Sequence, residues 1–181
     1  MKKRILTGDR PTGKLHLGHY VGSLSNRLQL QRDWELFIVV ADYHTLTTKP
    51  EESAELEERI REIVLDYLAV GIDPEISRVY IQSQLPETAV LALLFSMLTV
   101  VPRLERVPTL KEQLRVLKIP SPSLGLLSYP VLQAADILIV RAHLVPVGKD
   151  QESHIELTRE IARRFNSLYR EGFPEPEVLV G

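Results

Sequence analysis

The sequence contains no cysteine, and this absence excludes disulfide bonds and thiolate metal sites. A membrane-spanning run is also missing, because the longest apolar stretch, AVLALLFSMLTVV at 89–101, is too short to cross a bilayer. The first residues, MKKRILTGDRP, lack the apolar segment of a signal peptide. We therefore expect a cytoplasmic protein that does not associate with membranes.

The sequence also lacks an excess of positive or negative charge. The 22 lysines and arginines nearly balance the 24 aspartates and glutamates, which leaves a net charge of -2. This balance argues against a chain whose whole surface binds nucleic acid, although it allows a local basic patch. What is present is ordinary for a globular protein: 181 residues, 44% of them hydrophobic and 25% charged, enough for one domain with a real core.

Apolar strands alternate with helical patterns along the chain. Strands are predicted at 4–8, 35–44, 78–84 and 143–148, helices at 20–33, 48–71, 86–101, 129–140 and 150–170, and an irregular segment at 102–125. This alternation predicts an α/β fold with a doubly wound parallel sheet. In such a fold the ligand binds at the carboxyl ends of the strands, near the point where the strand order reverses.

The first strand-to-helix turn is rich in glycine. Glycines at Gly8, Gly13 and Gly18 remove side chains that would keep a phosphate away from backbone amides. Amides at the start of a helix form an anion site, so the turn is a candidate phosphate site. Its spacing differs from that of a Walker loop, which requires other glycine positions and a following Ser or Thr.

Two histidines stand in the same turn. His16 and His19 are three residues apart, so they share one face if the helix has begun. Two imidazoles there could donate hydrogen bonds to phosphate oxygens as charge develops in a transition state. A zinc site would need a third ligand, which the neighbouring sequence does not supply. A glycine-rich turn with two solvated histidines is the alternative.

These residues carry a resemblance to a known family. HLGH at 16–19 is similar to the HIGH signature of class I aminoacyl-tRNA synthetases, and TGDRPTGKLHLGHYVGSL resembles the opening of the bacterial tryptophanyl-tRNA synthetases. The likeness continues through LDYLAVGIDP, IQSQLPE, YPVLQAADILIV and VPVGKDQESHIELTREIARRFN, and so covers nearly the whole chain. It implies a Rossmann-like catalytic domain over residues 1–181, in which residues 85–125 form a helical dimer-interface insertion.

The resemblance also implies an activity. A member of this family is a tryptophan–tRNA ligase, which activates L-tryptophan with ATP to tryptophanyl-adenylate, releases pyrophosphate and transfers the amino acid to tRNA(Trp). The expected partners are therefore tryptophan, ATP with Mg²⁺, tRNA(Trp) and a second copy of the chain, and no metal is expected on protein ligands. His16, Gly18 and His19 would be catalytic. The resemblance places ATP against Gly8, Arg10, Pro11, Thr12, Gly13, Gly18, His19, Gly148, Lys149 and Asp150.

A helical face in the second half of the chain suits an indole. Tyr129, Gln133 and Asp136 recur at helical spacing, and Asp136 lies in the apolar run AADILIV, where a carboxylate needs a partner. An indole offers one N–H donor, which an acceptor-only carboxylate matches. A helix cap or a buried ion pair is the alternative for Asp136. The resemblance assigns Asp136 to the indole nitrogen and places tryptophan against Leu6, His44, Tyr129, Gln133, Asp136, Val147 and Gln151.

Some positions depart from the pattern of the family. Gln133 stands where many bacterial relatives have methionine, and Arg10 replaces a frequent glutamine.

The turn VGKDQ contains a candidate ribose ligand. Asp150, two residues after Gly148, has the chemistry to accept hydrogen bonds from both ribose hydroxyls, and this role is compatible with a helix N-cap.

The second signature of the family, KMSKS, has no counterpart in the sequence, nor does the helical domain that reads the anticodon. We therefore expect this chain to be the catalytic portion of a longer enzyme. Two alternatives stay open: an enzyme of the tyrosyl-tRNA synthetase type, and a non-catalytic module that binds tryptophan or a nucleotide.

Overall fold

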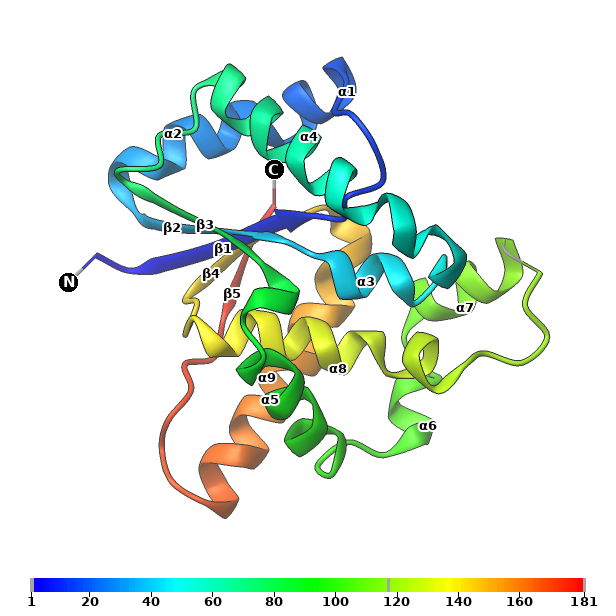
Figure 1. The fold of residues 1–181 in the computed structure, drawn as a ribbon. Coiled ribbons are helices and arrows are strands. Elements are labelled where there is room, and N and C mark those ends of the chain that lie inside the picture. Colours follow the sequence, from blue (N-terminus) through cyan, green and yellow to red (C-terminus); the bar gives the residue numbers. More distant parts are fainter. Residues whose placement is uncertain (1, 117, 181) are drawn as a thin grey trace. The chain divides into compact units, whose positions relative to one another are not determined.

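The computed structural model describes residues 2–116 and 118–180. The chain divides into two compact units, the first ending at Leu85 and the second beginning at Pro86. Each unit is an α/β assembly of its own, with parallel strands joined through helices (Figure 1).

The first unit contains three parallel strands in the order β3-β2-β1, so each new strand is added at the same edge. Its elements are β1 (Arg4–Asp9), α1 (Leu17–His19), the π-helical turn η1 (Tyr20–Leu24), α2 (Ser25–Asp33), β2 (Glu35–Val40), α3 (Asp42–Leu46), η2 (Pro50–Glu55), α4 (Leu56–Val70), β3 (Ser77–Ile81) and η3 (Gln82–Gln84). Figure 1 shows α2 and α4 on the same face of these strands.

Burial explains why β2 is the central strand of the first unit. Leu36, Ile38 and Val40 are completely buried, although they alternate with residues on the opposite face of the strand. Parallel strands covered by helices have this continuous apolar character. Helix α4 ends at Gly71, whose φ of 103° lies in the left-handed region that glycine adopts without strain.

The second unit is built around helix α8. Its elements are α5 (Glu87–Ser96), α6 (Val101–Leu104), α7 (Pro108–Val116), α8 (Leu124–Ile139), β4 (Leu144–Val147), η4 (Lys149–Gln151), α9 (Glu152–Leu168) and β5 (Glu177–Val180), and β4 pairs with β5 in parallel. Helix α8 packs against α5 and α9. Phe95, Phe165 and Phe173 meet edge to face at centroid distances of 4.8–6.0 Å and close one end of this core.

Three expectations about local structure were wrong. The strand predicted at 35–44 ends at Val40, because Asp42 begins α3 and its Oδ1 accepts hydrogen bonds from the amides of Tyr43 and Ser83, each at 3.0 Å. The segment 102–125, predicted to be irregular, contains α6, α7 and the start of α8. Its prolines Pro102 and Pro108 stand in first turns, where a missing N–H costs nothing. Strand β5 was not predicted.

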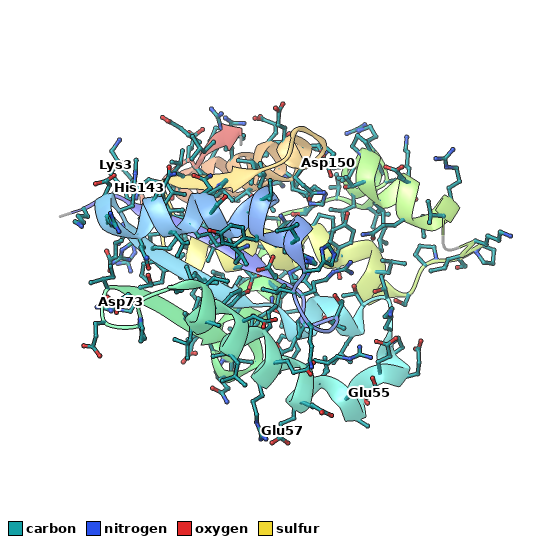
Figure 2. All side chains as sticks on the ribbon, turned by 90° about the horizontal axis from the view of Figure 1, so that it is seen from above. Lys3, Glu55, Glu57, Asp73, His143 and Asp150 are labelled. Carbon is teal, nitrogen blue, oxygen red and sulfur yellow. The ribbon has the colours of Figure 1, made fainter. Side chains whose placement is uncertain are left out.

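Charged side chains such as Lys3 and Glu57 point outward from the ribbon (Figure 2). Among the described residues, no helix has the length and apolar character needed to cross a bilayer.

Candidate active site

The two histidines of the first unit cap one helix reciprocally. His16 is the N-cap of α1, and its Nδ1 accepts a hydrogen bond from the Gly18 amide at 3.1 Å. The His19 Nδ1 in turn accepts from the amide of His16 at 3.1 Å. This is the geometry of a capping box, with imidazoles in place of the usual hydroxyl and carboxylate.

The capping fixes which ring nitrogen carries the proton. A nitrogen that accepts a hydrogen bond is unprotonated, so the proton of each neutral imidazole lies on Nε2. The two ring centroids are 4.0 Å apart, and the His16 side chain is exposed. The turn therefore presents two Nε2–H donors that are not used in holding its own backbone.

The glycines of the turn serve different purposes. A Cβ on Gly18 would lie 2.9 Å from the His16 ring, so glycine leaves room for the capping imidazole. A Cβ on Gly8 would lie 2.3 Å from the Val39 carbonyl oxygen of the paired strand β2. Glycine at position 8 therefore allows close approach of the neighbouring strand β2. Gly13 has a φ of +127° and open space around it, so its need for glycine is conformational.

A buried ionic network lies at the carboxyl end of β1. The Arg27 guanidinium donates to both carboxylate oxygens of Asp9 at 2.5 and 3.0 Å, and the Tyr67 hydroxyl donates to Asp9 Oδ2 at 2.6 Å. The Arg27 side chain is only 3% exposed. Burial by itself raises the pKa of Asp9, but the charge of Arg27 and the hydrogen bonds from Arg27 and Tyr67 outweigh it and hold the pKa below its ordinary value.

The same network keeps Tyr67 a donor. Burial and the neighbouring Asp9 carboxylate raise the pKa of the Tyr67 hydroxyl well above its ordinary value. The network was not predicted from the sequence. The acidic residue Asp9 at the end of the strand RILTGD was the pattern that could have revealed it.

The other predicted site residues of the first unit are dispersed over several elements. Leu6 is buried on β1, and His44 is buried on α3. Arg10 donates to the Thr48 hydroxyl at 3.5 Å, and the Thr12 amide donates to the Arg10 carbonyl at 2.8 Å. Thr12 is exposed, whereas Pro11 is buried.

Helix α8 of the second unit carries the three residues predicted to share a face. Tyr129 and Asp136 are buried, with 8% and 3% of their surface exposed, and Gln133 is half-buried. All three residues lie in one continuous helix, so Gln133 and Asp136 follow Tyr129 by about one and two helical turns, as predicted. The arrangement combines a carboxylate, an amide and a phenol along an apolar helix.

Two further residues hold the Tyr129 hydroxyl. Thr109 Oγ1 lies 3.0 Å from Tyr129 Oη, and His154 Nε2 lies 3.2 Å from the same oxygen. Thr109 and His154 also hydrogen bond to each other, and His154 is completely buried. Sequence reasoning missed Thr109 because it belongs to the segment predicted to be irregular. His154 was available from the sequence as a histidine on the inner face of an amphipathic helix.

The turn VGKDQ joins β4 to α9. Asp150 is exposed (Figure 2) and accepts a hydrogen bond from the Gln151 side-chain amide at 2.8 Å. A Cβ on Gly148 would lie 2.7 Å from Asp150 Oδ1, so the glycine leaves room for this carboxylate. Val147 ends β4 and is half-buried, as is Gln151. The Lys149 side chain lies outside the described part of the structure.

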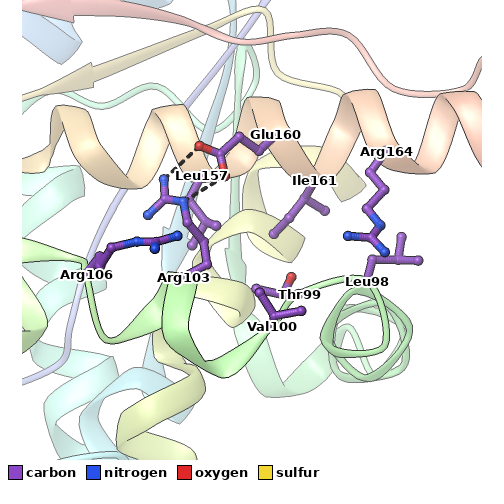
Figure 3. A pocket seen from close by; sticks show the side chains of 9 residues that line it. All are labelled: Leu98, Thr99, Val100, Arg103, Arg106, Leu157, Glu160, Ile161 and Arg164. Atoms are coloured by element: carbon purple, nitrogen blue, oxygen red, sulfur yellow. Dashed lines mark hydrogen bonds and ion pairs between the residues drawn. The ribbon is translucent and has the colours of Figure 1, made fainter.

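A pocket of about 220 Å³ opens elsewhere in the second unit (Figure 3). It is lined by Leu98, Thr99, Val100, Arg103, Arg106, Leu157, Glu160, Ile161 and Arg164. Arg103 donates to both carboxylate oxygens of Glu160, at 2.7 and 2.9 Å. None of the sequence-predicted site residues lines this pocket, so it is separate from the predicted tryptophan residues. In the described part of the chain, no group of three or more His, Cys, Asp or Glu side chains could hold a metal ion.

The parallel α/β units and the HLGH segment after the first strand fit the class I aminoacyl-tRNA synthetases that the sequence resembles. The family described as tRNA synthetases class I (W and Y) matches residues 1–181, and the chain belongs to this family. Among its relatives, the tryptophan–tRNA ligase of Treponema pallidum is 58% identical over 179 residues, covering 98% of this chain and 53% of that protein. The tryptophan–tRNA ligase of Thermotoga maritima is also 58% identical, covering 98% of this chain and 55% of that protein.

A solved structure shows the same architecture. Tryptophanyl-tRNA synthetase from Campylobacter jejuni, complexed with ADP and tryptophan, matches with a TM-score of 0.91 at 38% identity, covering 98% of this chain and 55% of that one. The prediction of a parallel, Rossmann-like α/β fold of the class I type is thereby confirmed. The chain spans about half the length of the curated relatives that it matches.

Proposed function

We propose that this chain forms the tryptophan-activating part of a tryptophan–tRNA ligase. The reaction is attack of the tryptophan carboxylate on the α-phosphate of ATP, which forms tryptophanyl-adenylate and releases pyrophosphate. The full-length enzyme then transfers the amino acid to tRNA(Trp). The observation that carries the proposal is the reciprocal capping of His16 and His19, which leaves both Nε2–H groups available as donors.

The donors suit phosphoryl transfer. This chemistry needs positioning and stabilisation of charge on phosphate oxygens more than it needs a protein nucleophile. Two preoriented Nε2–H groups supply hydrogen bonds where negative charge grows, at little reorganisation cost. His16, Gly18 and His19 are therefore the proposed catalytic residues, with Gly18 leaving room for the His16 ring.

We assign ATP to residues of the glycine-rich turns that follow β1 and β4, as the resemblance of these sequences implies. The proposed ATP-binding residues are Gly8, Arg10, Pro11, Thr12, Gly13, Gly18, His19, Gly148, Lys149 and Asp150. Asp150 suits the ribose, because its exposed carboxylate is an acceptor for two hydroxyl donors. ATP enters as its magnesium complex, in which the ion is held largely by the phosphates.

We assign tryptophan to the polar side chains of α8. Asp136 accepts the indole N–H, and this buried hydrogen bond favours tryptophan, because an amino acid side chain without a donor gains no such bond. Tyr129 is held by Thr109 and His154. The full proposed set is Leu6, His44, Tyr129, Gln133, Asp136, Val147 and Gln151.

A second copy of the chain covers an apolar face of α5. Val90, Leu93 and Met97 recur at helical spacing, and 58%, 59% and 69% of their respective surfaces are exposed. Such a stripe is typical of an interface that is covered in the assembly. We place the homodimer interface on this helix, within residues 85–125, and the enzyme in the cytoplasm.

Tryptophan-dependent ATP–pyrophosphate exchange tests the proposed function, with tyrosine as the competing substrate because the family includes both specificities. The measurement uses this chain and the full-length enzyme. Exchange with tryptophan and none with tyrosine supports the proposal. Exchange with tyrosine alone identifies the tyrosyl type. Binding of tryptophan or ATP by the full-length protein without exchange identifies a non-catalytic module.

A further inference from the structure

The segment that carries the histidines starts in a loop. Between the end of β1 at Asp9 and the start of α1 at Leu17, residues 10–16 belong to no helix or strand. We call residues 10–19 the histidine turn. Fixing each residue of such a loop costs conformational entropy, so a turn that must hold two donors in place needs anchors outside itself.

Neighbouring residues of α4 anchor the two ends of this loop. The Leu15 amide donates to Asp66 Oδ2 at 2.8 Å, and the Tyr67 hydroxyl donates to Asp9 Oδ2 at 2.6 Å. Asp66 and Tyr67 are consecutive on α4, and Tyr67 is completely buried. The helix therefore holds the chain just before the loop, at Asp9, and near the end of the loop, at Leu15.

The Asp66 contact continues directly into the histidine capping. Leu15 donates its amide to Asp66, and the next amide along the chain, that of His16, donates to His19 Nδ1. Two consecutive amides are thus each committed to a side-chain acceptor. Because Asp66 is half-buried, its bond to the Leu15 amide is partly shielded from competing water.

We propose that Asp66 is a positioning residue for the reaction: it sets the direction in which the chain enters α1 and so aims the His16 and His19 donors. This inference rests on the proposed adenylation activity. Asp66 acts through the backbone of Leu15, whereas Asp9, Arg27 and Tyr67 form the fixed base at the other end of the loop. Its loss should lower the rate of adenylate formation more than it weakens substrate binding.

Three variants of the full-length enzyme separate this role from simpler ones. Asp66→Ala removes the acceptor, and Asp66→Asn keeps an acceptor oxygen but removes the charge. Glu62→Ala is the matched control, because Glu62 lies one turn earlier on α4 and reaches the same turn through the exposed Lys14 ammonium, at 3.6 Å, rather than through a backbone amide. Single-turnover adenylation is measured for each, with apparent affinities for ATP and tryptophan.

We expect Asp66→Ala to lower the single-turnover rate about 10- to 100-fold, with both affinities changed by no more than about threefold. Asp66→Asn should restore most of the rate, and Glu62→Ala should match the wild type. Asp66→Ala at the wild-type rate would overturn the proposal. So would an Asp66→Asn rate as low as that of alanine, since the charge and not the hydrogen bond would then matter.

Amide hydrogen exchange gives a readout that does not depend on activity. Asp66→Ala should speed exchange at Leu15 and His16, while protection in the β2 core stays unchanged. If the wild-type enzyme shows no tryptophan-dependent adenylation, the proposed function fails, and the exchange data still decide whether Asp66 holds the turn. Unchanged protection at both amides contradicts the positioning role.

Discussion

The two units hold their proposed functional side chains by opposite means. In the first unit the histidines stand on an exposed turn, and a buried ionic network of Asp9, Arg27 and Tyr67 lies at the end of the strand that leads to it. In the second unit Tyr129 and Asp136 stand on helix α8, inside an apolar core. There the hydroxyl of Tyr129 is held by a network of Thr109 and His154 rather than by a salt bridge.

This difference follows from where each group sits. A side chain on a packed helix inherits its position from the helix, so it needs only local hydrogen bonds to fix its polar atoms. A side chain on a loop does not, so the loop must be anchored by strong contacts at its ends. The first arrangement suits donors that act on a reacting phosphate, and the second suits selective binding of an amino acid. Substitutions in each unit test the contrast.

The largest effect is expected from removing the cation of the first network. Arg27→Met leaves the Asp9 carboxylate buried without its counter-ion, which should lower the free energy of unfolding by about 3–5 kcal/mol. Chemical denaturation measures the loss. Arg61→Met is the control, because the Arg61–Glu57 pair is exposed and should contribute nothing measurable. Equal losses in the two variants would contradict the account.

The pH dependence of the free energy of unfolding tests the same network. The pKa of Asp9 is lowered in the folded state, so its stabilisation is complete above the ordinary carboxyl pKa of about 4 and is lost as the pH falls through the folded value. The stability difference between wild type and Asp9→Asn should therefore be constant near neutrality and shrink below about pH 4.

The next effect concerns the imidazoles themselves. His16→Ala should lower the rate of adenylation by about 10²–10³ while ATP binding changes far less. His16→Ser separates the two roles of this residue, because serine is a good N-cap but lacks the Nε2–H donor. If serine restores the rate, His16 serves the turn only as a cap, and its assignment as a catalytic donor is wrong.

A smaller effect should follow from Asp136→Asn. An amide can turn its N–H toward the indole N–H, so tryptophan binding should weaken by roughly 1–3 kcal/mol. Calorimetry on the folded variant measures this loss. A tryptophan analogue without the indole N–H supplies the comparison, since it should bind both proteins with similar affinity. Unchanged tryptophan affinity removes Asp136 from the indole site.

The smallest effect is expected at Thr109. Thr109→Val preserves the shape of the side chain and removes its hydrogen bonds to Tyr129 and His154, a loss of about 1 kcal/mol. The KM for tryptophan should rise about fivefold, the KM for ATP should stay constant, and Thr109→Ser should recover the wild-type value. Thr99→Val, which removes a hydroxyl bonded to the Phe95 carbonyl, should leave both constants unchanged.

Much of the fold was predictable because the strands of the first unit are short, apolar and bounded by polar residues. The end of the helix predicted at 48–71 followed from glycine's access to positive φ at Gly71, although the α-helical part, α4, begins only at Leu56 after the 3-10 helix η2. Segment 102–125 was misassigned in its first half because Pro102 and Pro108 were taken as breakers, although both occupy first turns of helices. Strand β5 is only four residues long, and its pairing with β4 is a tertiary effect that no local pattern encodes.

The candidate site was predictable where its residues follow a periodic or motif-like pattern, as on α8 and at HLGH. The residues that anchor the ends of the histidine turn were not predictable in this way. Asp66 and Arg27 lie on helices whose sequence shows only ordinary surface charge, and their partners Leu15 and Asp9 stand 51 and 18 residues away. Such pairs become visible only when the chain is folded, because long-range contacts leave no local periodicity.

The division of labour between the two units is tested most directly by measuring His19→Ala and Asp136→Asn side by side in the full-length enzyme. Single-turnover adenylation at saturating substrate gives the rate, and equilibrium titration gives the tryptophan affinity. The account predicts that His19→Ala loses about 10²–10³ in rate with tryptophan affinity unchanged. Asp136→Asn should lose about 10- to 100-fold in affinity and keep the saturated rate within a few-fold. Equal losses of rate and affinity in both variants would contradict it.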